Sequence, residues 1–132
     1  MKRLTVDAVE LFPLATDQLE GFQLEGPAAG AASNNQALYL DGWVMGRKSP
    51  VRAVEVLQDG RLVLRIPVKT PRQDLAAAFP DTPEAATSGF SAAVGALRLR
   101  TGFELLLRGE LESGVTTPLA TITGRRERLE LP

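Results

Sequence analysis

An arginine and two aspartates lie close together in the segment TPRQDLAAAFPDTP, from Thr70 to Pro83. Arg72 and Asp74 are two residues apart there, and Asp81 follows. A guanidinium near carboxylates in a turn usually forms a structural fork, in which oxygens of the protein itself satisfy its donors. The alternative is a ligand-facing arginine that binds a sugar carboxylate or a phosphate. Arg72 and Asp74 are therefore candidate ligand-binding residues.

Two aromatic side chains are the other candidates for ligand contact. In the predicted strand ALYLDGWVM, residues 37–45, alternation places Trp43 and Tyr39 on the face opposite Leu38 and Leu40. A tryptophan on a central strand of a sandwich is usually part of the core. The alternative is a platform that stacks against a sugar ring. The low aromatic content, 5% of the chain, argues against the platform.

The chain contains neither histidine nor cysteine. It therefore lacks the side chain most often used for acid–base catalysis near neutral pH, and it lacks thiolates. The carboxylates of Asp41, Glu55, Asp74 and Asp81 could pair as acid and base, but nothing in the sequence separates their pKa values. No calcium-type Asp-x-Asp-x-Asp loop or glycine-rich phosphate loop occurs. We expect no enzyme activity, no catalytic residue, no cofactor and no metal site.

Length and charge indicate one globular domain over residues 1–132. The net charge of −1, from 15 basic and 16 acidic residues, argues against a nucleic-acid partner, which requires a basic surface. The opening MKRLTVDAVELF lacks the unbroken apolar core of a signal peptide. No segment approaches the ~20 apolar residues of a membrane span. We expect a soluble, cytoplasmic domain.

Short strands with turn signals between them make up most of the chain. The pattern predicts a variable N-terminal strand in residues 1–14, a surface loop in residues 26–36 and a charged tail in residues 124–132. Turn signals recur at about ten-residue spacing, which is typical of sandwiches. The prediction is an all-β fold, an immunoglobulin-like antiparallel β-sandwich of seven to nine strands, with a barrel as the alternative.

The clearest local signal is Asp59-Gly60, which predicts a tight hairpin turn because both residues tolerate positive φ. In the strand that follows, alternation assigns the apolar side chains to a dry face and Arg61, Arg65 and Lys69 to a wet one. Pro67 cannot donate to a ladder, which predicts an edge position. The side chains expected on the dry face are Leu62, Leu64, Ile66 and Val68.

A short helical insertion is predicted near residues 71–79. Thr70 is suited to cap the helix, Pro71 to begin it, and Gln73 to complete a capping box. Leu75 and Phe79 are four residues apart and would hold the helix against the sandwich. A second short turn is expected at Thr82-Pro83-Glu84-Ala85-Ala86. On this interpretation the segment is a connector.

Three stretches, in this order, resemble a small β-sandwich module found in bacterial proteins beside glycosyltransferase and related transferase domains. They are GWVMG (42–46), VRAVEVLQDGRLVLRIPV (51–68) and PRQDLAAAFPDTPEAATSGF (71–90). The resemblance covers Phe22 to Gly124, and Leu75 departs from it where the module has valine. The matching positions are Gly42-Trp43, Val54 to Gly60, Arg72, Asp74, Ala76, Ala78 to Asp81, Pro83 and Ser88 to Phe90.

The resemblance implies a non-catalytic accessory domain near surface-polysaccharide synthesis, and it transfers no catalytic residue. Such a domain would position a glycosyltransferase-type partner or contact its glycan. The alternative is a structural or homo-oligomerising sandwich that associates through a sheet face or edge. A groove with Trp43 or Tyr39 beside Arg72 would favour glycan contact. A flat face exposing Leu57, Val63 or Leu106 would favour self-association.

Overall fold

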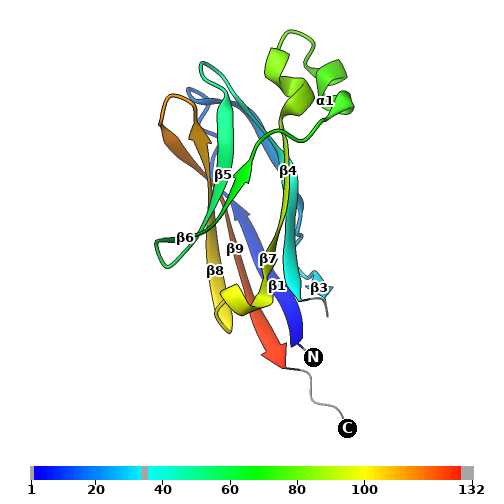
Figure 1. Ribbon diagram of the computed structural model, residues 1–132, viewed down its shortest axis with the longest axis vertical. Helices are drawn as coiled ribbons and strands as arrows, with labels where there is room; N and C mark the ends of the chain where they lie inside the picture. The colour runs from blue at the N-terminus through cyan, green and yellow to red at the C-terminus, as the bar shows by residue number, and fades with distance from the viewer. Residues whose placement is uncertain (1, 34–35, 129–132) are drawn as a thin grey trace.

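The computed structural model describes residues 2–33 and 36–128. These residues form nine strands in two antiparallel sheets, with one short α-helix at one end (Figure 1). The predicted all-β antiparallel sandwich of seven to nine strands is therefore confirmed. The strands are β1 (Lys2–Leu11), β2 (Leu19–Gly26), β3 (Ala32–Ser33), β4 (Ala37–Gly46), β5 (Val51–Gln58), β6 (Arg61–Pro67), β7 (Gly89–Gly95), β8 (Gly102–Leu111) and β9 (Thr116–Arg128).

The larger sheet has the strand order β3-β1-β9-β8-β5-β6, and the smaller sheet has the order β2-β4-β7. β6 lies at an edge, as Pro67 predicted. The core lies between the sheets, because alternate side chains of each strand point to the same face. Its fully buried large members include Leu4, Leu19, Leu40, Val44, Ile66, Phe90, Leu105, Leu107, Leu111, Leu119 and Ile122.

The β5–β6 hairpin turns at Asp59 and Gly60, which have φ of 53° and 75°. Two consecutive residues at positive φ match the turn that the Asp-Gly pair predicted. The predicted faces of β6 are only partly right. Val56 pairs with Leu64 and Leu57 with Leu62, so that Val63 is the extra residue of a bulge. The bulge turns Val63 inward and leaves Leu62 52% exposed, which corrects the prediction for Leu62.

Three predicted boundaries were wrong. The N-terminal strand ends at Leu11, and the predicted loop 26–36 contains the end of β2 and the two-residue strand β3, which pairs with β1. Residues 124–128 of the predicted tail belong to β9, where Gly124 is buried and Arg125 is exposed. A charged segment can continue a strand because only one of its faces must be apolar. Residues 1, 34, 35 and 129–132 of these predictions lie outside the described residues.

The helical insertion consists of α1 (Gln73–Ala78) and a 3₁₀ turn, η1 (Pro83–Thr87). Both elements were predicted, but the capping box was not found. The N-cap is Arg72 and has no side-chain cap bond. Thr70 instead exchanges two backbone hydrogen bonds with Gly89, at 2.9 and 3.1 Å, so it is held in the bridge to β7 and not at the helix start.

No helix in the described part of the chain is long and apolar enough to cross a membrane.

Candidate functional site

Arg72 is bound by two carboxylates at the start of α1. Its Nε and Nη2 donate to the two oxygens of Asp74 at 3.0 and 2.8 Å. Its Nη1 and Nη2 donate to the two oxygens of Glu25 at 2.6 and 3.0 Å. Hydrogen bonds from Arg72 are the main cause of the lowered pKa of Asp74, and bonds to Asp74 and then Glu25 raise the pKa of Arg72. This arrangement is the structural fork, with Glu25 as an additional member.

Glu25 lies on β2, 47 positions before Arg72 in the chain. The pair therefore joins the beginning of the helical insertion to the smaller sheet. Asp81, which also lies near Arg72 in the sequence, is in none of the ion pairs found among the described residues. Because Arg72 already holds two carboxylates, it offers little to an anionic ligand. A shallow cavity of about 150 Å³ adjoins Arg72 and Asp41.

Trp43 lies on the outer face of the smaller sheet, under the helical insertion. Its ring centroid is 5.9 Å from that of Phe79, and the ring planes are tilted by 54°. Its Nε1 donates to Oε1 of Gln23 at 3.3 Å. Trp43 and Phe79 pack against a small second core of Met45, Leu75 and Ala85. Trp43 is thus a packing residue, as the core interpretation held, but in a cluster separate from the main core.

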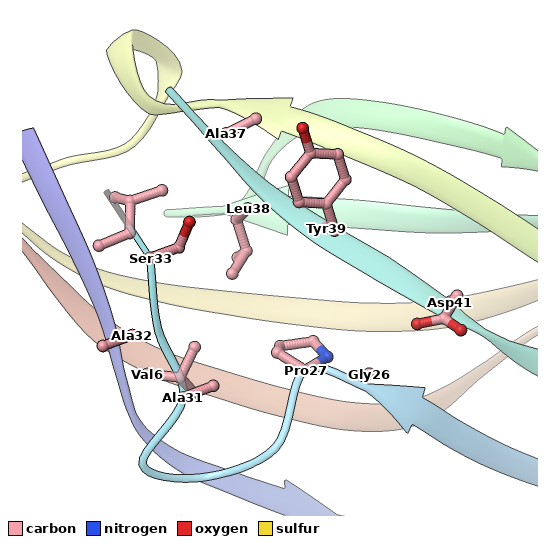
Figure 2. Close-up of a pocket in the computed structure, with 11 residues that line it drawn as sticks. Val6, Gly26, Pro27, Ala31, Ala32, Ser33, Ala37, Leu38, Tyr39 and Asp41 are labelled. Carbon is pink, nitrogen blue, oxygen red and sulfur yellow. The ribbon is translucent and has the colours of Figure 1, made fainter. Parts of the chain in front are cut away.

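Tyr39 occupies the same face of β4 but is 59% exposed. It does not lie with Trp43 or Arg72, so the four candidate residues do not form one site. Tyr39 borders instead an apolar cavity of about 270 Å³ between β4 and the segment that leads into β3 (Figure 2). Sequence reasoning missed this cavity, although Gly26-Pro27 indicated that β2 ends there.

The cavity is lined by small and apolar side chains with Asp41 beside it. Leu4 and Val6 of β1 and Leu38 of β4 line it from the core side, where all three are buried. Gly26, Pro27 and residues 31–33 form the wall opposite β4 (Figure 2). A Cβ atom on Gly26 would lie 2.5 Å from Oδ1 of Asp41, so the carboxylate occupies the space that a side chain would fill.

A larger, polar cavity of about 440 Å³ lies between the ends of β5 and β6 and the turn η1. Arg52, Lys69, Glu84 and Glu112 line it. Burial raises the pKa of Glu84, the backbone N–H of Gly46 opposes that effect, and the nearby carboxylates of Glu112 and Glu20 add to it. The cavity therefore mixes both signs of charge around one partly desolvated carboxyl group.

We predict that Glu84→Gln stabilises the protein at pH 7 and has little effect at pH 3.5. The folded-state pKa of Glu84 lies above its ordinary value of 4.5, so charging this group costs more in the folded state. The cost is full above the folded-state pKa and disappears below 4.5, where both states are protonated. Urea unfolding at the two pH values measures the difference, with Glu104→Gln at an exposed position as the control. If Glu84→Gln changed the free energy of unfolding equally at both pH values, this prediction would be wrong.

Of the remaining three carboxylates considered as acid or base, two form ion pairs within the fold and one forms none with any described residue. Glu55 is buried on the outer face of the larger sheet, where Nε of Arg108 donates to its Oε1 at 2.9 Å. Asp74 is bound to Arg72, and Asp41 forms no ion pair with any described residue. Within residues 2–33 and 36–128 no three acidic side chains are grouped so that they could hold a metal ion.

Comparison of the chain with known protein families, curated proteins and solved structures gives no match. The resemblance to modules beside transferase domains therefore stays a prediction from residues 42–46, 51–68 and 71–90.

Proposed function

We propose that this chain is a non-catalytic accessory module that positions a partner protein. The observation that carries the proposal is the apolar cavity beside Tyr39, which the described part of the fold leaves open at one side of the sandwich. A concave apolar site with a few polar groups at its border is the usual form of a binding site. The lining of the cavity would give a partner a concave surface that is mostly apolar.

Two further features favour a protein partner over a glycan. Arg72 is held by Glu25 and Asp74, and Trp43 is packed under Phe79, so neither forms a groove with Tyr39. A sugar site would need several exposed aromatic faces and free hydrogen-bonding groups, whereas the lining of this cavity holds one tyrosine, one serine and one carboxylate. The sequence resemblance adds that the partner would be a glycosyltransferase-type protein.

The non-catalytic part of the proposal is supported by how the carboxylates are used. Arg72 lowers the pKa of Asp74, and Arg65 with Arg52 lowers that of Glu110, so these groups serve as charged partners in ion pairs. Glu84, a carboxyl group with a raised pKa, has carboxylate neighbours, and the sequence contains no histidine to act with it.

Parallel selections test the proposal: the folded domain is presented to a display library of random linear peptides and to a bacterial glycan array. We expect enriched peptides that compete with one another for one site, and no retained glycan. An unrelated β-sandwich domain serves as the control for non-specific enrichment. A glycan bound by the wild type and lost in a folded Tyr39→Ala variant would make this a carbohydrate-binding module.

Self-association is the remaining alternative. The apolar face that would favour it is small: Leu57 and Val63 are 8% and 9% exposed and Leu106 is half-buried, so that Leu62, which pairs with Leu57, is its exposed member. Sedimentation of the domain at increasing concentration distinguishes the two cases. A monomer is expected, and a dimer with no peptide enrichment would replace the accessory function by a structural one.

A further inference from the structure

Among the described residues, the smaller sheet has no strand beside the first residues of β4 on the side of β2. β2 pairs with β4 from Leu19 opposite Gly46 to Gly26 opposite Asp41, and the pairing ends there. On its other side β4 pairs with β7 from Ala37 onward. Within the described residues, Ala37 to Leu40 therefore have a strand neighbour on one side only.

The backbone groups on the uncovered side belong to Ala37 and Tyr39. The N–H of Val44 donates to Ser88 and the carbonyl of Gln36 accepts from Ala96, so the even-numbered residues direct these groups toward β7. Successive residues of a strand direct their N–H and C=O groups to opposite sides. Ala37 and Tyr39 therefore direct theirs toward the line of β2. Both residues are at least partly exposed.

The chain leaves this line at Pro27, which has no N–H to donate to β4. It crosses to the larger sheet, where Ser33 pairs with Leu4 and Ala32 with Thr5 (Figure 2). The crossing leaves the 270 Å³ cavity in the place that a continued β2 would cover. The gap thus combines backbone groups of Ala37 and Tyr39, which pair with no described strand on this side, with an apolar surface from β1.

We propose that an extended segment of a partner protein adds here as a short strand, antiparallel to β4 and in line with β2. The inference rests on the proposed accessory function and specifies its mode of binding. Strand addition draws affinity from backbone bonds and specificity from alternate side chains. The residue opposite Leu38 would point into the cavity, and its two neighbours would point outward, over the face that carries Tyr39.

The same geometry defines the side chains that the segment should carry. The inward residue should be apolar and branched, such as valine, because it would contact Leu4, Val6 and Leu38. The outward residue opposite Tyr39 should be basic. Its stem would cross the tyrosine ring, and its charge would reach Asp41, which forms no ion pair with any described residue.

The probe is the peptide acetyl-Thr-Lys-Val-Lys-Thr-amide, whose side-chain pattern reads the same in both directions. Titration is followed by amide NMR, with hydrogen exchange at saturating peptide. We expect slowed exchange at the amides of Ala37 and Tyr39 and little change at Leu38 and Leu40, which β7 already covers. N-methylation of the two lysines removes the N–H groups that face β4 and should abolish binding, whereas side-chain contact alone would survive it.

Two matched variants of residues 31 and 29 test the cavity. Val6 donates its N–H to the carbonyl oxygen of Ala31, so Ala31 is on the inner face with Leu4 and Val6 and lines the cavity, whereas Ala29 is exposed and is not a lining residue. Ala31→Leu should fill the cavity and weaken peptide binding by about tenfold, whereas Ala29→Leu should change it less than about twofold. Unchanged amide spectra outside residues 26–41 confirm that both variants fold.

The inference is overturned if the peptide does not bind at millimolar concentration, or if binding protects amides elsewhere. It is also overturned if Ala31→Leu and Ala29→Leu bind the peptide equally well. Peptides selected from the display library that bind another surface would leave the accessory function in place and remove this mode of binding. Failure of that selection, with no binding of the probe, would remove both.

Discussion

Replacing Trp43 by alanine is expected to lower the free energy of unfolding by about 2–4 kcal/mol, somewhat less than full truncation of a buried tryptophan. The indole contacts Phe79, and a Cβ atom on Gly21 would lie only 2.8 Å from its Cη2 and Cζ3 atoms. Truncation would therefore open a space between β2 and the helical insertion. Urea unfolding followed by circular dichroism measures the loss, because the variant has no other tryptophan to report by fluorescence.

Tyr39→Ala is the matched control for this prediction. It removes an aromatic ring from the same face of the same strand, but Tyr39 is 59% exposed and outside the second core. We expect a change within about 0.5 kcal/mol, the usual range for a surface substitution. If Trp43→Ala changed the free energy of unfolding as little as Tyr39→Ala, the indole would not hold the insertion. The alternative, in which Trp43 stacks against a sugar ring, would then be favoured. Faster amide exchange across Gln73–Ala78 in Trp43→Ala would locate the damage in α1.

Arg72→Ala should cost about 1–3 kcal/mol. The estimate is above that of an exposed ion pair because the guanidinium makes four hydrogen bonds to two carboxylates and its side chain is 20% exposed. Its loss leaves Glu25 and Asp74 facing a common space without their shared cation. Asp74 adds a pH dependence: its lowered pKa contributes stability that is present above its ordinary value of 3.8 and is lost as the pH falls through the folded-state pKa.

A double-mutant cycle with Glu25→Gln separates the pair from general damage. If Arg72 acts through Glu25, the cost of Arg72→Ala should be clearly smaller in the Glu25→Gln background. Arg72→Lys should recover only part of the stability, because an ammonium cannot bind two carboxylates in bidentate geometry. Additive effects in the cycle would show that the ion pair is incidental. Loss of peptide binding in a folded Arg72→Ala variant would assign Arg72 to the partner site.

The fold was predictable because its signals are local. Period-two alternation reports which side of a strand is apolar, and Asp59-Gly60 reports a turn through the φ angles that it permits. The helical insertion was found from its prolines and from the spacing of Leu75 and Phe79. The errors arose where pairing with a neighbouring strand changed the local geometry. The bulge in the β5–β6 pairing, for example, buries Val63 and exposes Leu62, the reverse of what alternation predicted.

The candidate site was less predictable. The sequence suggested that Arg72 would have carboxylate partners and that Trp43 would be packed. It did not show that Glu25 joins Arg72 from β2, or that the outer face around Trp43 is covered by the insertion. Each strand has two faces, and alternation does not say whether a second layer covers the outer one.

By itself, the sequence determined the strand content, the tight hairpin, the helical connector and the absence of histidine and cysteine chemistry. The tertiary structure alone decided which residues meet across the chain, and it left the cavity beside Ala37 and Tyr39. The physical reason is the range of the forces involved. Backbone preference and side-chain alternation act within a few residues, whereas strand order and register depend on contacts between segments that the sequence does not place together.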